Sequence, residues 1–471
     1  MVPSGHGTAF WSTLFLTFIV LSLLVPPPVT AFFSLANDFV DPSYILSGKY
    51  KNQTQVAQQT LIAWANELNV QAPWSVTNKT YVAPSGDKHD YMSWSPYWWP
   101  DCSRVGNTTV LSLQTEWTTC PYVNRDGRIN PDVTMIKDDL SFQNLSDGIF
   151  YNAMAWGLQS DRGSTVYSRS AVNFINTWFL NPDTKMNPNL DYAQIIRGPH
   201  QWQGSQYGLI DLKCFPKIAS AILILRDGKA PDWTPDIDTG MASWAKEYIN
   251  WLQTSAQGIN ESRSTNNHGT FYENQLAALK LISGDVTGAN QNARAYFSNQ
   301  YLNQISANGK QPLELARTRP YHYSAFNIAG MITNGRIAAY TGNSSVWNLP
   351  SLSGATIKTA VDYAITMNAS ATNETPAIDE LTPYIAAVAS IYGDPNGKYK
   401  TQLDTMQSGW QSEAWVVWNQ PLKMDLSSPS SSSSSSLATG TNSSSTSSSE
   451  KSMGVNLLLA LMGLLMGCFL Q

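Results

Sequence analysis

Apolar residues recur at spacings of three and four through much of the chain, which is the pattern of helices that bury one face. The segments with this pattern are residues 55–68, 150–159, 167–180, 208–225, 241–256, 271–284, 293–306, 326–342, 355–367 and 381–393. Several of them close on Gly or Asn, as helix C-termini often do. No run of alternating polar and apolar residues is comparably clear, so the pattern predicts an all-α domain.

Long polar connectors interrupt the helical pattern at residues 76–134 and 181–207, which are rich in Trp, Tyr, Pro and Asn. A simple helix bundle needs no such connectors, and long ordered loops in a compact domain are commonly functional. Helical hairpins set in a ring, with these loops lining a central cleft, account for both features. We therefore predict an incomplete (α/α) toroid around a substrate cleft.

The N-terminal end has the pattern of a processing signal rather than of a folded element. Residues 12–25 are apolar but short for a membrane span, and a small-residue site that ends at Ala31 follows them. This arrangement predicts a secretory signal peptide over residues 1–31, although residues 1–11 lack the Lys or Arg that such peptides usually carry.

The C-terminal end has a Ser-rich segment over residues 427–452 and an apolar tail over residues 453–471. A polar spacer and a terminal apolar tail are typical of a glycosylphosphatidylinositol (GPI) anchor signal, with an attachment site near Asn442 to Ser444. A tail-anchoring transmembrane helix is the alternative. We predict the GPI signal, with membrane contact only through the lipid anchor, which leaves residues 32–426 for the folded domain.

Composition and cysteine usage point to the same compartment. The chain carries 17 Trp, 21 Tyr and a formal net charge of −5, which gives no indication of the basic surface that nucleic-acid binding needs. Cys102 and Cys120 flank a polar loop and are predicted to form a disulfide, whereas Cys214 lies in an apolar stretch as a buried thiol. Eight N-x-[ST] sequons lie between Asn52 and Asn373. We expect a secreted, glycosylated monomer at the cell surface, with no nucleic-acid partner.

The stretch HDYMSWSPYWWPD packs five aromatic side chains into thirteen residues from His89 onwards. Its two prolines exclude a regular helix, so the stretch presents its rings from a rigid loop. Flat aromatic faces suit the apolar faces of sugar rings, whereas burial in the core is the alternative for each ring. We predict that Tyr91, Trp98 and Trp99 bind substrate.

A histidine beside two asparagines, in STNNHGTFYENQ, stands at a predicted helix start. Thr270 and Glu273 have the spacing of a capping box, which predicts that the helix begins near Gly269. The helix dipole there disfavours imidazolium, which leaves His268 neutral and able to accept a proton. Asn267 can donate its amide to a carboxylate or enolate oxygen. The same residues could merely cap the helix, so this motif alone does not decide between the two.

A cluster of arginines and tyrosines lies further along, in PLELARTRPYHYSAFN. Pro320 pushes Arg319 into an extended conformation, and Ser324 is expected to cap the helix that follows. In an extended segment, the side chains that project to one side are those of Arg317, Arg319, Tyr321 and Tyr323. Two arginines and two tyrosines need an anionic or polar partner, which is either an acid such as Glu314 or a substrate.

Asn, His, Arg and Tyr together are sufficient for cleavage of a polyuronate by β-elimination. Arg and Asn can neutralise the uronate carboxylate and stabilise the charge that develops when the weakly acidic C5 proton is removed. A neutral His or an ionised Tyr takes that proton, and a Tyr hydroxyl protonates the departing O4. This reaction needs no cofactor and no metal.

These three motifs, in this order, resemble the alginate lyase family of secreted, all-helical polysaccharide lyases, from about Tyr91 to Leu381. The resemblance implies an incomplete (α/α) toroid with a tunnel-like cleft and an acidic polysaccharide substrate. The family's catalytic Asn-His pair, Arg and Tyr fall on Asn267, His268, Arg317 and Tyr323. The resemblance implies Tyr as general acid, His or Tyr as base, and Asn with Arg as carboxylate neutralisers.

Several details stay open. Alginate-cleaving members space Arg and Tyr one residue further apart, so Arg319 is an alternative neutraliser. D-mannuronate and D-glucuronate differ only at C2, so the polymer could be alginate or glucuronan, cleaved in endo or exo mode. Further cleft candidates are His200 and Gln203, in GPHQWQG, and His322.

Two other functions compete with this interpretation. A glycoside hydrolase on a similar toroid needs two acids flanking the cleft, and no acidic pair lies in the aromatic or Arg-Tyr motifs. A non-catalytic wall-polysaccharide binder has no need of the Asn, His, Arg and Tyr set. The sequence therefore favours a polysaccharide lyase that acts on a uronate polymer.

Overall fold

The structure is a computed structural model that describes residues 38–71, 73–105, 111–199 and 202–420. These residues belong to the second of two compact units, residues 34–471. The predicted signal peptide, Ser-rich linker and apolar tail lie outside the described residues. Within the described part, no helix has the length and apolarity needed to cross a membrane.

The described residues are mainly helical, and the all-α prediction is confirmed. The α-helices are α2 (Pro42–Ser47), α3 (Gln55–Gln71), α4 (Leu113–Thr119), α5 (Asp138–Leu158), α6 (Val166–Ile175), α7 (Phe215–Asp227), α8 (Pro235–Thr254), α9 (Ala256–Glu261), α10 (Asn267–Ile282), α11 (Val286–Ser298), α12 (Pro312–Leu315), α13 (Pro320–Tyr340), α14 (Ile357–Ala364), α15 (Thr382–Tyr392) and α16 (Lys398–Met406). The strands are β1 (Met92–Trp94), β2 (Trp98–Pro100), β3 (Tyr122–Asn124) and β4 (Tyr192–Ile195). Every segment predicted from the apolar periodicity overlaps a helix.

The long helices alternate along the chain between helices that are buried over most of their residues and helices that bury only one face. In α10, 14 of 16 residues are buried, whereas in α8 only 5 of 20 are. Helices α5, α7, α13 and α15 resemble α10, and α6, α11, α14 and α16 resemble α8. Helical hairpins produce this alternation when one helix of each pair is inside and the other outside. The predicted incomplete (α/α) toroid is confirmed.

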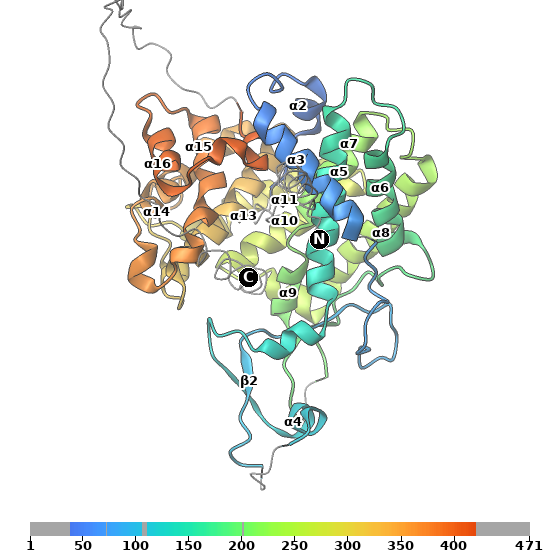
Figure 1. The fold of residues 1–471 in the computed structure, drawn as a ribbon. Coiled ribbons are helices and arrows are strands. Elements are labelled where there is room, and N and C mark those ends of the chain that lie inside the picture. The colour runs from blue at the N-terminus through green and yellow to red at the C-terminus, as the bar shows by residue number, and fades with distance from the viewer. Residues whose placement is uncertain (1–37, 72, 106–110, 200–201, 421–471) are drawn as a thin grey trace, which may run out of the picture. The chain divides into compact units, whose positions relative to one another are not determined.

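Helix α10 lies at the centre of the helix packing (Figure 1). It contacts α7, α8, α11 and α13, and α13 in turn contacts α11, α14 and α15. Helix α5 packs against α3, α6 and α7. The inner helices are therefore buried by neighbours on most sides, which explains why polar side chains of α10 such as Thr270, Asn274 and Gln275 are buried together with its apolar ones.

The aromatic stretch forms two short strands instead of a plain loop. Strand β1 pairs in parallel with β4, and β2 pairs antiparallel with β3. A disulfide joins Cys102 to Cys120 between β2 and β3, and Cys214 is a buried free thiol. Figure 1 shows β2 and α4 projecting from the ends of the helices.

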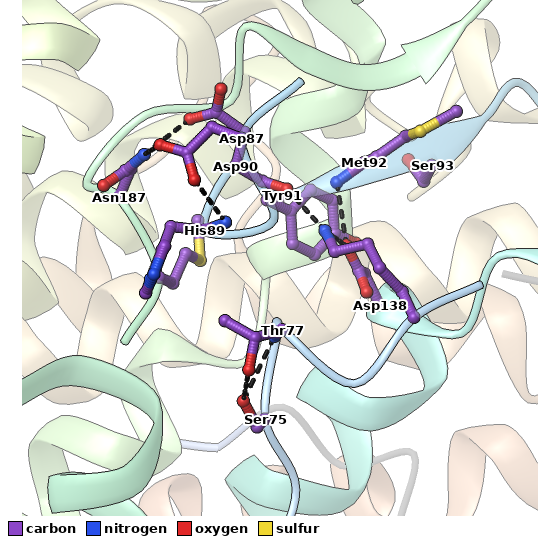
Figure 2. Close-up of polar contacts among 12 residues, drawn as sticks. Ser75, Thr77, Asp87, His89, Asp90, Tyr91, Met92, Ser93, Asp138 and Asn187 are labelled. Carbon is purple, nitrogen blue, oxygen red and sulfur yellow. Dashed lines mark hydrogen bonds and ion pairs between the residues drawn. The ribbon is translucent and has the colours of Figure 1, made fainter. Parts of the chain in front are cut away.

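Buried acids anchor the start of this aromatic stretch. Asp138, in the first turn of α5, pairs with Lys79 at 2.5 Å and accepts from the backbone N–H of Met92 at 3.0 Å. Asp90 accepts from the side-chain amide of Asn187 at 2.8 Å (Figure 2). These contacts hold β1 in place and thereby orient the aromatic residues that follow it.

The raised pKa values of two buried carboxyl groups indicate how the stability of the protein depends on pH. Burial raises the pKa of Asp211 to about 7, with a further contribution from the Asp139 carboxylate, and burial raises the pKa of Glu273 to about 7. The same groups titrate at about pH 4 in the unfolded chain. Between about pH 4 and 7 the folded state therefore binds more protons, and the free energy of unfolding falls as pH rises through that window.

We expect urea unfolding to give a free energy at pH 5 that exceeds the value at pH 8 by a few kcal/mol, since each pKa difference of one unit is worth about 1.4 kcal/mol. The Glu273→Gln variant removes one titrating group and should show a weaker pH dependence. An equal pH dependence in the variant and the wild type would contradict the role of Glu273.

Candidate active site

A cavity of about 520 Å³ opens where the aromatic stretch meets the N-terminal ends of α10 and α13. All four residues predicted to be catalytic lie in its wall. The wall consists of Ser95, Pro96, Tyr97, Trp98, Asn124, Asp126, Gln194, Tyr207, Ile210, Asn266, Asn267, His268, Arg317, Tyr323 and Phe326. Three motifs that are far apart in the sequence therefore meet at one site.

His268 is the second residue of α10, and a buried carboxylate holds its ring. Oε1 of Glu261, the last residue of α9, lies 2.5 Å from Nδ1 of His268. Because a carboxylate can only accept, we assign the proton of the neutral ring to Nδ1 and the lone pair to Nε2. The ring also packs edge-on against Tyr207, with ring centroids 5.3 Å apart.

Asn267 is held by a second buried carboxylate, that of Glu314 in α12. The backbone N–H of Asn267 donates to Oε1 of Glu314 at 2.8 Å, and Nδ2 donates to Oε2 at 2.6 Å. Burial raises the pKa of Glu314, and these two hydrogen bonds oppose that effect. Oδ1 of Asn267 has no hydrogen-bond partner among the described residues. Glu314, considered from the sequence as a partner for an arginine, instead orients Asn267.

The helix start differs from the predicted capping box. Helix α10 begins at Asn267, and Thr270 and Glu273 point into the core instead of capping it. The Thr270 hydroxyl donates to Asn327 at 2.8 Å, while Glu273 accepts from Asn292. Close packing requires glycine at position 269, since a Cβ there would lie 2.0 Å from the carbonyl oxygen of Ser264. The i, i+3 spacing that suggested a cap is also that of two residues on one buried helix face.

Arg317 lies between α12 and α13 and makes three contacts in the cavity wall. Its Nη2 lies 2.6 Å from Oδ1 of Asp126 and donates to the Tyr323 hydroxyl at 2.8 Å. Its guanidinium carbon lies 3.8 Å from the centre of the Tyr323 ring. Burial alone would raise the pKa of Asp126, but the hydrogen bond and charge of Arg317 and the bonds from Thr318 outweigh it and lower the pKa. Asp126 is therefore ionised at neutral pH.

Tyr323 joins the aromatic stretch to the Arg-Tyr motif. Its hydroxyl lies 2.8 Å from the hydroxyl of Tyr97. Burial raises the pKa of Tyr323 well above its ordinary value, Tyr97 adds to the increase, and Arg317 opposes it. Tyr323 is therefore protonated at neutral pH, which suits a proton donor rather than a base.

The prediction of an extended segment from Arg317 to Tyr323 is wrong. Helix α13 begins at Pro320, a residue that fits the first turn of a helix because that position needs no N–H. Tyr321 consequently turns away, and its hydroxyl donates to the carbonyl of Ile378 at 2.7 Å. Ser324 is buried inside the helix and does not cap it. Arg319 precedes the helix and is not part of the cavity wall.

Of the three aromatic residues predicted to bind substrate, one lies in the cavity wall and two do not. Trp98 lies in the cavity wall. Tyr91 is a core residue whose hydroxyl donates to Asp211 at 3.2 Å, so its assignment to the cleft is wrong. Trp99 lies outside the wall, where its Nε1 donates to the carbonyl of Arg128 at 2.7 Å. Pairing of β2 with β3 sends neighbouring side chains to opposite faces, which separates Trp98 from Trp99.

The remaining candidates do not line the cavity. His322 is buried with Nδ1 at 2.6 Å from Glu380, so it is a core residue of α13 and not a cleft residue. Gln203 is exposed and lies outside the wall. His200 lies outside the described residues.

Sequence reasoning missed several residues of the wall and the groups behind it. Tyr97 belongs to the aromatic stretch but was not singled out, and Asp126 and Glu261 carry no local motif. Gln194 has a left-handed backbone, with φ of 47°, and its side-chain amide donates to Asp211 at 2.8 Å. A non-glycine residue in that conformation is a sign of a constrained site, but the sequence carries no signal for it.

Within the described residues, no group of three His, Cys, Asp or Glu could hold a metal ion.

Comparison with known proteins agrees with this geometry. The family model described as alginate lyase matches residues 75–375, which include the whole cavity wall. The crystal structure of an alginate lyase from Bacteroides ovatus is similar, with a TM-score of 0.70 and 28% sequence identity, over 82% of this chain and 99% of that chain. No curated protein matches the chain. The chain thus belongs to the alginate lyase family and is a polysaccharide lyase.

Proposed function

We propose that the protein cleaves a uronate polymer of the alginate or glucuronan type by β-elimination across C4 and C5. The observation that carries the proposal is the meeting of Asn267, His268, Arg317 and Tyr323 in one cavity wall. These residue types supply what the reaction needs, namely neutralisation of a carboxylate, a base for the C5 proton and an acid for O4. The similar protein from Bacteroides ovatus is an alginate lyase, which supports the same polymer class.

In this proposal His268 is the base and Tyr323 is the general acid. The Nδ1 of His268 is occupied by Glu261, so Nε2 is the nitrogen that accepts the C5 proton. Burial keeps the phenol of Tyr323 protonated, which disfavours an ionised Tyr as base and provides the proton that the departing O4 needs.

Arg317 and Asn267 neutralise the substrate carboxylate in the proposal. The contacts of Arg317 to Asp126 and Tyr323 use Nε and Nη2, so the N–H groups of Nη1 are the ones to meet the carboxylate. The second amide hydrogen of Asn267 adds a donor beside it. The first N–H groups of α10 and α13 are already bound, that of Asn267 by Glu314 and those of Tyr321 and His322 by Glu374. The side chains of Arg317 and Asn267 are therefore the groups that neutralise the carboxylate in this proposal.

A hydrolytic mechanism fits the cavity less well. A glycoside hydrolase needs two carboxyl groups that flank the scissile bond. In the described wall, Asp126 is the acidic residue, and it is ionised and bound to Arg317 and Thr318. Glu261 and Glu314 lie behind His268 and Asn267 and do not belong to the wall.

We further propose that the enzyme is secreted, glycosylated and held at the cell surface by a GPI anchor, as a monomer. The terminal sequence patterns and the Cys102–Cys120 disulfide support an oxidising compartment. Five of the sequon asparagines are exposed, which fits glycosylation: Asn52, Asn78, Asn260, Asn368 and Asn373. Release of the protein from cells by a phosphatidylinositol-specific phospholipase tests the anchor, and retention after treatment contradicts it.

A panel of polymers tests the reaction. Purified enzyme is incubated with alginate, glucuronan and a neutral glucan as control, and both ultraviolet absorbance and reducing ends are followed. We expect absorbance from the new C4–C5 double bond on a uronate polymer and none on the glucan. New reducing ends without absorbance would identify a hydrolase, and binding without either product would identify a non-catalytic binder.

A further inference from the structure

We infer that Glu261 is a positioning residue of this reaction, one that acts through His268. It keeps the proton of the resting imidazole on Nδ1, so that Nε2 is the base, and it stabilises the imidazolium that forms when Nε2 takes the C5 proton. The inference rests on the proposed function and assigns a role to a carboxylate that does not belong to the cavity wall.

The geometry places the Glu261 carboxylate where it serves the ring and not the substrate. Glu261 is 1% exposed, and its Oε1 lies 2.5 Å from Nδ1 of His268. Its Oε2 accepts from the hydroxyl of Ser264 at 3.2 Å. Both oxygens thus face donors of the protein, and the ring of His268 stands between the carboxylate and the cavity.

The loop between α9 and α10 holds this pair together. The N–H of Ser264 donates to the carbonyl of Glu261 at 2.9 Å, and Gln300 donates to the carbonyl of Ser262 at 3.3 Å. Gly269 lets the first turn of α10 pass against the carbonyl of Ser264, where a Cβ would be only 2.0 Å away. The distance between carboxylate and ring is therefore set by backbone contacts on both sides.

Each residue of the Asn-His pair is hydrogen-bonded to a buried glutamate of its own. Glu314 is bound by the backbone N–H and the amide of Asn267, whereas Glu261 is bound by the ring of His268. The ring of Tyr207 packs edge-on against the imidazole of His268. His268 therefore has a carboxylate of its own, in the arrangement by which a buried acid orients a catalytic histidine.

The proton balance shows why the tautomer matters. Nε2 takes the proton from C5 as the C4–O4 bond breaks, the C4–C5 double bond forms, and Tyr323 gives its proton to O4. His268 is left as an imidazolium whose Nδ1–H donates to Glu261, and Tyr323 is left as a phenolate beside Arg317. If the resting proton were on Nε2 instead, the nitrogen facing the cavity would have no lone pair for the C5 proton.

The first measurement compares two isosteric variants. Glu261→Gln is expected to lower kcat about 100-fold or more while KM changes less than about threefold, because the groups that bind the substrate are intact. Glu273→Gln is the matched control, since Glu273 is also buried, lies in α10 outside the cavity wall, and accepts hydrogen bonds from Asn292 and Gln300, neither of which belongs to the wall. Its kcat should stay within about threefold of wild type. A Glu261→Gln enzyme with wild-type kcat overturns the inference.

The second measurement reads the tautomer without substrate. The chain has five histidines, so ¹⁵N-histidine NMR of the intact enzyme, with His268→Gln for assignment, isolates the His268 ring. When the imidazole of His268 in the wild-type enzyme is neutral, we expect its Nδ1 to be protonated and its Nε2 to be unprotonated. A protonated Nε2 in that state overturns the inference, even if Glu261→Gln does not fold.

The two measurements separate this inference from the proposed function. Wild-type enzyme that yields no ultraviolet-absorbing product on any uronate polymer contradicts the proposed function, and the NMR result still decides the tautomer. Active wild-type enzyme together with a fully active Glu261→Gln variant contradicts the role of Glu261 alone.

Discussion

Tyr323→Phe is expected to reduce turnover of a uronate polymer by about 100- to 10,000-fold, the usual contribution of a general acid. The substitution keeps the ring that packs under Arg317 and removes only the hydroxyl that contacts Arg317 and Tyr97. Without it, no phenolic proton reaches O4 from this position. Initial rates of absorbance increase on the polymer that the wild type cleaves best provide the measurement.

The matched control is Tyr321→Phe, two residues earlier in α13. The Tyr321 hydroxyl donates to the carbonyl of Ile378, outside the cavity wall. We expect activity within about threefold of wild type and a loss of stability of about 1 kcal/mol, because a single hydrogen bond is removed. Circular dichroism of both variants checks the fold. A folded Tyr323→Phe enzyme with near-wild-type turnover would exclude Tyr323 as the acid.

Arg317→Ala is expected to lower kcat/KM about 100- to 1,000-fold, as removal of one preorganised group at a developing negative charge usually does. The change removes the cation of the cavity wall and leaves the ionised Asp126 without it, so a substrate carboxylate meets repulsion instead of attraction. Arg317→Lys should restore little activity, because an ammonium cannot contact Asp126, Tyr323 and a carboxylate with one planar fork.

Arg319→Ala is the comparison that decides between the two arginines of the motif. Arg319 precedes α13 and lies outside the cavity wall, so we expect kcat/KM within about threefold of wild type. Both variants are assayed on the same polymer over a range of concentrations. A larger loss for Arg319→Ala than for Arg317→Ala would transfer the role of neutraliser to Arg319.

The neighbourhood of Tyr323 shows how far local reasoning reaches. The rule for residues before proline correctly isolates Arg319, whose backbone is not helical. It says nothing about the residues after Pro320, and an extended segment and a first helical turn are both compatible with a proline there. Packing of α13 against α10 and α11 decides for the helix, and this turns Tyr321 away and keeps Tyr323 in the cavity.

The sequence by itself determined the helical class, the approximate positions of the main helices and the Asn-His and Arg-Tyr motifs whose residues meet in the cavity wall. It could do so because apolar periodicity and short motifs are local properties of the chain. The tertiary structure alone decided which polar groups meet them. Asp126 and Arg317 are 191 positions apart, and Tyr97 and Tyr323 are 226 apart. Glu261 is only seven positions from His268, yet the turn between α9 and α10 is what brings its carboxylate to the ring. Such pairs depend on how helices and loops pack against one another, and no local pattern of residues encodes that packing.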